Sequence, residues 1–309
     1  MLSIVESFFI FIAISESILG ILGNGFIGLV NCMDCVKNKK FSVIGLLLIG
    51  LSTSRIFLIW LIMTDGFVKI FSPHMYNSGK LIECITYLWV IINHSSIWFA
   101  SSLSIFYFLK IANFSHRIFL WLKHRINRVI FLLMGLLLVS WLFIFPQIVM
   151  IVNDTKMKNR NKTEPLYMAK SDYLTFQFFL NIGVIFLFTL SLIACFLLII
   201  SLWRHSRHMQ SNVLGLRDPS TEAHVKAVKV LVSFIILFIL YFIGLAIEIS
   251  CFTVPENKLL FIFGVTTAAI YPWGHSLILI LGNNKLKQAS LKVLQPLMCC
   301  WKEKPLRTP

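Results

Sequence analysis

Seven long apolar runs, separated by short polar connections, make up most of the 309-residue chain. Each run is long enough to cross a bilayer as a helix, which takes about 20 residues. Charged residues are 13% of the chain, against roughly 25% in a soluble domain. Because lipid cannot hydrogen-bond to the backbone, apolar runs of this length fold as helices. The sequence predicts an all-α membrane protein, a seven-transmembrane helix bundle over 1–283, with spans near 7–33, 43–64, 85–111, 128–152, 175–203, 229–252 and 259–282.

The basic residues predict how this bundle is oriented. Of the 28 Lys and Arg residues, 19 lie in the loops after the first, third and fifth spans and in the tail; eight lie in the other connections, and Arg55 lies within the second span. Connections rich in Lys and Arg stay in the cytoplasm. We therefore expect a multi-pass plasma-membrane protein with an extracellular N-terminus and a cytoplasmic C-terminus.

The tail, 284–309, has a pattern typical of a short amphipathic helix on the inner leaflet. Leu286, Ala289, Val293 and Leu297 form an apolar stripe opposite several lysines, which predicts contact with membrane lipids. Cys299 and Cys300 follow this stripe, and palmitoylation and two unmodified thiols are equally good interpretations.

Two sequons lie in the longest extracellular connection. Asn161 is the better glycosylation candidate, since Asn153 is close to the expected end of a span.

No catalytic, cofactor or metal motif is evident in the chain, which argues against an enzyme. The basic residues follow apolar runs and are not interleaved with aromatic residues on a soluble face, so the net charge of +15 does not indicate nucleic-acid binding.

The third span has a polar seam. Asn93, Ser96, Ala100, Ser104 and Tyr107 recur at steps of three and four and share one helical face, with Trp89 a turn before Asn93. Such a face must meet protein or water. The seam lines a pocket or packs against neighbouring helices, and the sequence leaves both interpretations open.

Arg55 lies midway along the second span. A charged side chain at this depth raises the free energy of membrane insertion unless other groups form hydrogen bonds or ion pairs with it. Asn24 in the first span is at a similar depth, so we expect its amide oxygen, with backbone carbonyls, to accept from the guanidinium. A switch network and a static clamp between spans 1, 2 and 7 are equally good interpretations. His275 lies in the seventh span, beside the helix-bending Pro272.

Several stretches resemble one family of seven-helix receptors. The chain lacks the DRY, CWxP and NPxxY motifs of rhodopsin-like receptors and instead holds LGNGFIGLVN (22–31), LSTSR (51–55), FYFLKIANFS (106–115), SLWRHSRHMQ (201–210), RDPSTEAHVKAVK (217–229) and HSLILILGNNKLKQ (275–288). This set resembles the bitter taste receptors, the type 2 taste receptor family of G-protein-coupled receptors, and within it the subgroup around bitter receptor ten. The resemblance covers nearly the whole chain.

The resemblance implies a pocket for small bitter ligands in the outer half of the bundle and activation of a heterotrimeric G protein of gustducin type at the cytoplasmic face. By position, the ligand-binding residues would be Trp89, Asn93 and Tyr241. The activation network would comprise Asn24, Arg55, Tyr107, Lys110, His224, Lys226 and His275. Asn161 matches the family's glycosylation site.

The chain departs from the family pattern at one ligand position. Some members place a Glu in the seventh span for cationic ligands, but that place holds Val265 here, which draws attention to Glu248 in the sixth span. A small-molecule transporter or channel is the alternative function, although the chain has neither internal repeats nor a second mid-membrane charge to pair with Arg55.

Overall fold

A computed structural model describes residues 3–39, 42–72, 80–112, 114–160, 185–186, 188–201, 203–204, 219–251 and 258–302. Every regular element within these ranges is an α-helix: α1 (Ile4–Asn38), α2 (Val43–Phe71), α4 (Lys80–Ile111), α5 (Arg117–His124), α6 (Ile126–Arg160), the Phe188–Ser201 helix, α8 (Pro219–Cys251), α9 (Lys258–Gly282) and α10 (Asn284–Lys302).

Capping residues explain where the first two helices begin. Ser3 and Glu6 form a capping box at the start of α1: the Ser3 backbone nitrogen donates to Glu6 Oε2 (2.7 Å) and the Glu6 nitrogen donates to Ser3 Oγ (3.1 Å). Ser42 Oγ accepts from the Gly45 nitrogen (3.1 Å) before α2. Lys39, at the end of α1, has a left-handed backbone (φ 51°) that stops the helix.

The helices extend beyond the apolar runs. The first span was expected near 7–33 and the fourth near 128–152, but α1 covers Ile4–Asn38 and α6 covers Ile126–Arg160. Hydropathy marks only the part that suits lipid, whereas backbone hydrogen bonds continue the helix into polar residues.

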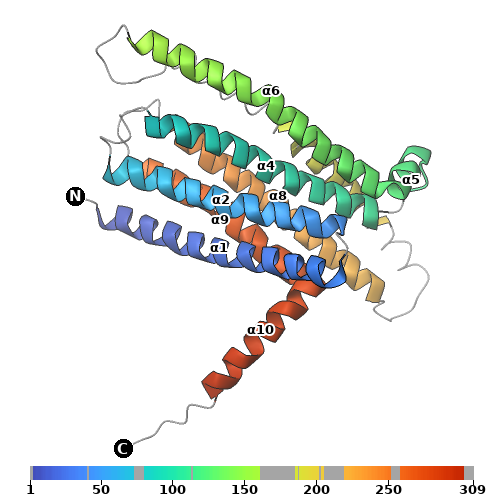
Figure 1. The fold of residues 1–309 in the computed structure, drawn as a ribbon. Helices are drawn as coiled ribbons and strands as arrows, with labels where there is room; N and C mark the ends of the chain where they lie inside the picture. The colour runs from blue at the N-terminus through green and yellow to red at the C-terminus, as the bar shows by residue number, and fades with distance from the viewer. Residues whose placement is uncertain are drawn as a thin grey trace, which may run out of the picture.

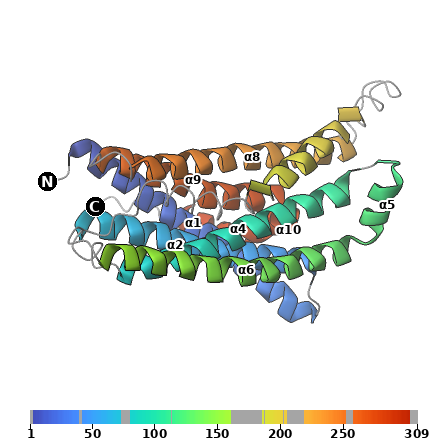
Figure 2. The ribbon, with the colours of Figure 1, turned by 90° about the horizontal axis from the view of Figure 1, so that it is seen from above.

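In the described part of the chain, five helices are long and apolar enough to cross a membrane. Two shorter apolar helical segments are also present, Phe188–Ser201 and Val232–Ile247, the second of them within α8. This agrees with the predicted fold class. The helices lie roughly along one direction, with α1, α2 and α4 beside α8 and α9 and with α6 on the outside (Figures 1 and 2).

Helix α4 is the most enclosed of the five. Its most apolar window is 67% buried, against 11% for α6 and 22% for α1. Asn93, Ser96, Ala100 and Ser104 are all buried, so the polar seam faces the interior, as the spacing predicts. The side chains that α1 and α6 expose are largely apolar, which suits helix faces in contact with lipid.

Helices α5 and α10 both lie at the end of the bundle where α9 stops. The short α5 joins α4 to α6, and its Phe119 packs edge-on against Phe108 of α4 (5.4 Å between centroids). α10 leaves the end of α9 at an angle and runs away from the bundle (Figure 1). Its first residues are anchored, because Leu286 is fully buried and Lys285 Nζ lies 2.7 Å from Asp34 Oδ2 of α1.

Candidate functional site

The candidate site is a path of polar and aromatic side chains that crosses the bundle from α4 to α2. Its first contact lies between α4 and α8, where the Tyr241 hydroxyl donates to Asn93 Oδ1 (2.6 Å). Both side chains are buried, at 3% exposure for Asn93 and 0% for Tyr241. Two predicted ligand residues therefore bind each other, and in this conformation Asn93 contacts a neighbouring helix.

Contacts between aromatic rings extend the path from α8 to α9. The rings of Tyr241 and Tyr271 lie 5.3 Å apart between centroids, and Phe238 packs edge-on against Tyr271 at 5.4 Å. Phe234, a turn further along α8, lies 4.9 Å from the His275 ring. Ring pairs at these separations are favourable beyond the area they bury. Helices α8 and α9 therefore share one aromatic layer.

Arg55 of α2 lies at the end of the path. Its Nη2 donates to the Tyr271 hydroxyl (2.9 Å) and to Nδ1 of His275, and its guanidinium carbon lies 4.7 Å from the centroid of the Tyr271 ring. A guanidinium can only donate, so Nδ1 of His275 accepts and the proton of this neutral ring is on Nε2. Arg55 is fully buried, and these contacts partly offset its removal from water.

The expected contact between Asn24 and Arg55 is wrong. Asn24 Nδ2 donates to the backbone oxygens of Gly20 (2.8 Å) and Pro272 (3.0 Å), and Asn24 Oδ1 has no partner among the described residues. The side chain of Asn24 therefore stabilises the α1–α9 interface. Asn24 and Arg55 both contact α9, but Asn24 accepts no hydrogen bond from Arg55.

Tyr271 is the residue that sequence reasoning missed. Tyr271 and His275 are four residues apart in the seventh span and share a helical face. That spacing marks them as a pair, but only the fold shows that Arg55 lies opposite them.

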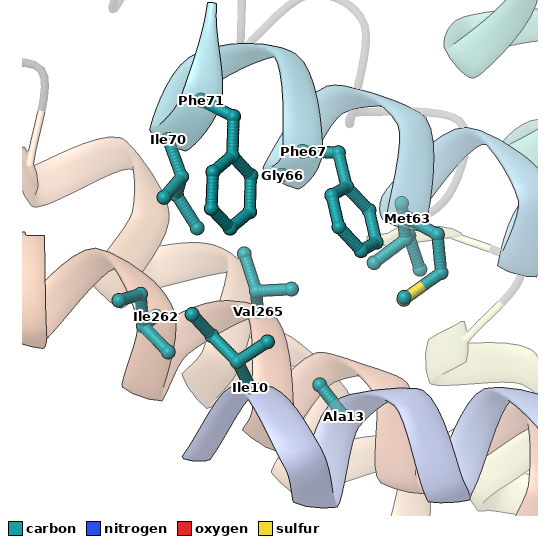
Figure 3. A pocket seen from close by; sticks show the side chains of 10 residues that line it. Ile10, Ala13, Met63, Gly66, Phe67, Ile70, Phe71, Ile262 and Val265 are labelled. Carbon is teal, nitrogen blue, oxygen red and sulfur yellow. The ribbon is translucent and has the colours of Figure 1, made fainter. Parts of the chain in front are cut away.

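Trp89 and Val265 are brought together in a second apolar cluster. Val265 packs with Leu58, Ile62 and Phe261, and Trp89 lies against this cluster and against the main core that contains Tyr241. Val265 also lines a small groove of about 30 Å³ between α1, α2 and α9 (Figure 3). Sites for drug-sized ligands are roughly 300–1,000 Å³, so this apolar groove is too small to be the predicted ligand pocket.

The remaining described candidates lie toward the end of the bundle that carries α10. Tyr107 is half-buried and its side chain meets Asn283, whose Oδ1 caps α10 by accepting from the Lys285 nitrogen (3.0 Å). Lys110 is exposed, with Nζ 5.6 Å from the centroid of Phe106. This end also carries α5, on which Arg117 and His124 are exposed.

Several predicted residues lie outside what the structure describes. Asn161 is not among the described residues. The remaining ones have a described helical backbone but no described side chain; they are Asn153, His224, Lys226, Glu248, Cys299 and Cys300. Among the described residues, no group of three or more His, Cys, Asp or Glu side chains could hold a metal ion.

Comparison with known proteins identifies the family. The family described as taste receptor protein (TAS2R) matches residues 1–298. The chain is 71% identical to taste receptor type 2 member 10 of Papio hamadryas and 68% identical to that of Homo sapiens, each over 307 residues and 99% of both chains. It is 59% identical over 297 residues to taste receptor type 2 member 105 of Mus musculus, with 96% of this chain and 99% of the relative covered. The chain therefore belongs to the taste receptor type 2 family, as its motifs indicate.

Proposed function

We propose that this protein is a G-protein-coupled receptor for small bitter compounds. The ligand binds in the half of the bundle nearest the N-terminus, which faces the outside of the cell, and the opposite face activates a heterotrimeric G protein of gustducin type. Family membership, the apolar helices and the basic connections support this proposal.

The observation that carries the proposal is the unbroken path from Asn93 to His275. Tyr241 bonds Asn93 with its hydroxyl and packs against Tyr271 with its ring. Tyr271 in turn accepts from Arg55, which also donates to His275. The side chain of Tyr271 thus links Tyr241, a proposed ligand residue, to Arg55.

Ligand binding would act by competing for this contact. A bound compound with a hydrogen-bond donor bonds Asn93 Oδ1 in place of Tyr241. The Tyr241 hydroxyl then loses its acceptor and must move. Because Tyr241 is fully buried against Tyr271, its ring cannot move without shifting the α8–α9 layer. A ligand that prefers the shifted packing raises the population of the active state.

The opposite end of the bundle suits a G-protein partner. Tyr107 and Lys110 lie at the end of α4, and Arg117 of α5 follows them in the chain. His224 and Lys226 begin α8, so a shift of this helix reaches the same face. We assign α10 to the inner leaflet, with Cys299 and Cys300 as candidate lipid anchors.

In the proposed ligand site, Glu248 is the candidate partner for ligands that carry an amine.

A compound screen tests the function directly. Cells that express this receptor with a gustducin chimera are exposed to bitter compounds, and calcium release is recorded. Asn93→Ala is expected to shift the potency of several agonists, while Thr189→Ala, on an exposed helix face, leaves it unchanged. An unchanged dose–response for Asn93→Ala across those agonists contradicts a ligand-binding role.

Arg55→Ala tests the coupling end of the path. The substitution removes both bonds to α9, so we expect signalling to be lost at equal surface expression. Normal agonist-driven calcium release from Arg55→Ala would contradict the proposal. Ligand-evoked current in cells without a G protein would instead favour the transporter or channel alternative.

A further inference from the structure

Arg55 is a fully buried cation whose described partners carry no negative charge. Its Nη2 donates to the hydroxyl of Tyr271 and to Nδ1 of His275. The His275 ring is neutral because Nδ1 accepts, and a phenol is neutral at physiological pH. The bonds therefore satisfy part of the donor capacity of Arg55 but leave its charge in place.

The acids with described side chains do not pair with Arg55. Asp34 bonds Lys285 at the end of α1, and Glu6 caps the first turn of that helix. Glu16 and Asp65 lie on the stretches of α1 and α2 nearest the end where the N-terminus lies. In the part of the chain whose side chains are placed, no carboxylate is within 4.0 Å of the guanidinium nitrogens.

Two nitrogen atoms of Arg55 also remain available. Nε and Nη1 are both buried and have no hydrogen-bond partner among the described residues. Each N–H in such surroundings needs an acceptor, because an unpaired donor in an apolar interior is costly. Leu51 and Leu58, one turn away on either side along α2, are buried and apolar and supply none.

We propose that Arg55 binds a small monovalent anion, chloride in cells, through Nε or Nη1 between α2 and α9. A chloride ion accepts N–H bonds and cancels the formal charge, which neutral partners cannot do. Arg55 and Tyr271 are fully buried and His275 is 3% exposed, so a bulky organic anion is excluded and an ion as small as chloride requires the least rearrangement of these neighbours. The inference requires neither a bitter ligand nor a G protein.

Water is the competing occupant. Asn24, whose Nδ2 bonds the backbone oxygen of Pro272 beside Tyr271, has a buried Oδ1 without a described partner, and this acceptor would bind a water molecule and not an anion. A water molecule could satisfy an N–H of Arg55 but would leave its charge uncompensated. The experiment must therefore separate anion binding from hydration.

The test uses the full-length receptor purified into lipid nanodiscs. Thermal unfolding is followed at constant ionic strength while chloride is replaced by gluconate, with bromide as a second small anion. If the site is filled in chloride, its loss lowers the thermal midpoint by about 5 °C, and bromide preserves the midpoint. Equal midpoints in chloride, bromide and gluconate would overturn the proposal.

Variants locate the effect. Arg55→Gln is expected to abolish the difference between chloride and gluconate, while Arg128→Gln, which removes an exposed basic residue of α6, preserves it. A chloride effect that survives in Arg55→Gln would place the ion elsewhere on the basic surface and contradict the proposal.

A direct binding measurement keeps the test decisive if Arg55→Gln fails to fold. Radioactive chloride should bind the wild-type receptor, be displaced by bromide and be unaffected by gluconate. Arg128→Gln, which alters an exposed basic residue outside the site, should retain this binding. Absence of displaceable chloride on the folded wild-type receptor would overturn the proposal.

Discussion

At the scale of single residues, the contact between Asn93 and Tyr241 is the most informative. The two residues are 148 positions apart in the sequence, and the short hydrogen bond between them joins α4 to α8 in the buried interior. A buried amide oxygen that loses its donor costs about 1–3 kcal/mol, because water cannot replace the missing partner. The pair therefore joins α4 to α8 as well as forming part of the proposed ligand site.

Tyr241→Phe and Asn93→Ala test this pair as a double-mutant cycle. Each substitution should lower the thermal midpoint of the purified receptor, and the double variant should be no less stable than the less stable single variant, since only one bond is lost. The expected coupling is about 1 kcal/mol. Additive losses would mean that the two side chains stabilise the bundle independently.

At the scale of elements, the close approach of α8 and α9 decides how movement is transmitted. A Cβ on Gly244 would lie 2.6 Å from the Ala268 nitrogen and 2.9 Å from the Gly264 oxygen, so the two backbones nearly touch there. Small residues allow such contact between membrane helices. The aromatic layer of Tyr241 and Tyr271 lies immediately beside this contact, so the two helices are well placed to shift together.

Gly244→Ala should separate α8 from α9. The added methyl meets backbone that cannot rotate away, so we expect a loss of about 1–3 kcal/mol and reduced surface expression. Gly25→Ala is the matched control, because nothing lies within 4 Å of its added Cβ and alanine is the better helix former. Equal thermal midpoints for the two variants would contradict the close approach.

The attachment of α10 depends on burial more than on charge. Leu286 is 0% exposed, whereas the ion pair of Lys285 and Asp34 is 44% and 38% exposed. Exposed ion pairs contribute only about 0–1 kcal/mol, while truncating a buried Leu typically costs about 2–5 kcal/mol.

Leu286→Ala is therefore expected to release α10 from the bundle, and Lys285→Gln should leave it in place. The measurement is the distance between spin labels on α1 and α10 in nanodiscs. Leu291→Ala, on a residue that is 49% exposed, controls for the substitution itself. Release of α10 in Lys285→Gln alone would show that the ion pair is the dominant contact.

At the scale of the whole molecule, the distribution of charge predicts the orientation. The connections after the first, third and fifth spans and the tail hold 19 of the 28 basic residues, against eight in the other connections, and this asymmetry predicts the cytoplasmic side. The chain also carries sequons on both predicted sides, Asn161 on the outside and Asn113 on the inside. Only an asparagine that enters the secretory lumen can be glycosylated.

Asn161→Gln is expected to remove the shift in gel mobility that glycosidase treatment produces, while Asn113→Gln preserves that shift. The result follows from the predicted orientation, which keeps Asn113 in the cytoplasm. A shift that disappears in Asn113→Gln and persists in Asn161→Gln would reverse the predicted orientation of the bundle.

Much of the architecture followed from the sequence because its determinants are local. Apolar length predicted the helical spans, and the spacing from Asn93 to Tyr107 predicted which face of α4 is buried. The extension of the helices was missed because it depends on hydrogen bonds in polar residues that hydropathy does not mark. The helix α5 was missed because eight residues are too few to form a clear periodic pattern.

The sequence by itself determined that the chain is a seven-helix membrane protein of the taste receptor type 2 family, and it singled out Arg55 as the residue that requires an explanation. Only the tertiary structure decided what Arg55 contacts. Its partners Tyr271 and His275 are 216 and 220 residues away, and Asn24 bonds the backbone of α9 instead. Periodicity reports which face of a helix is buried, but the partner of that face depends on how helices pack across the bundle, which no local pattern encodes.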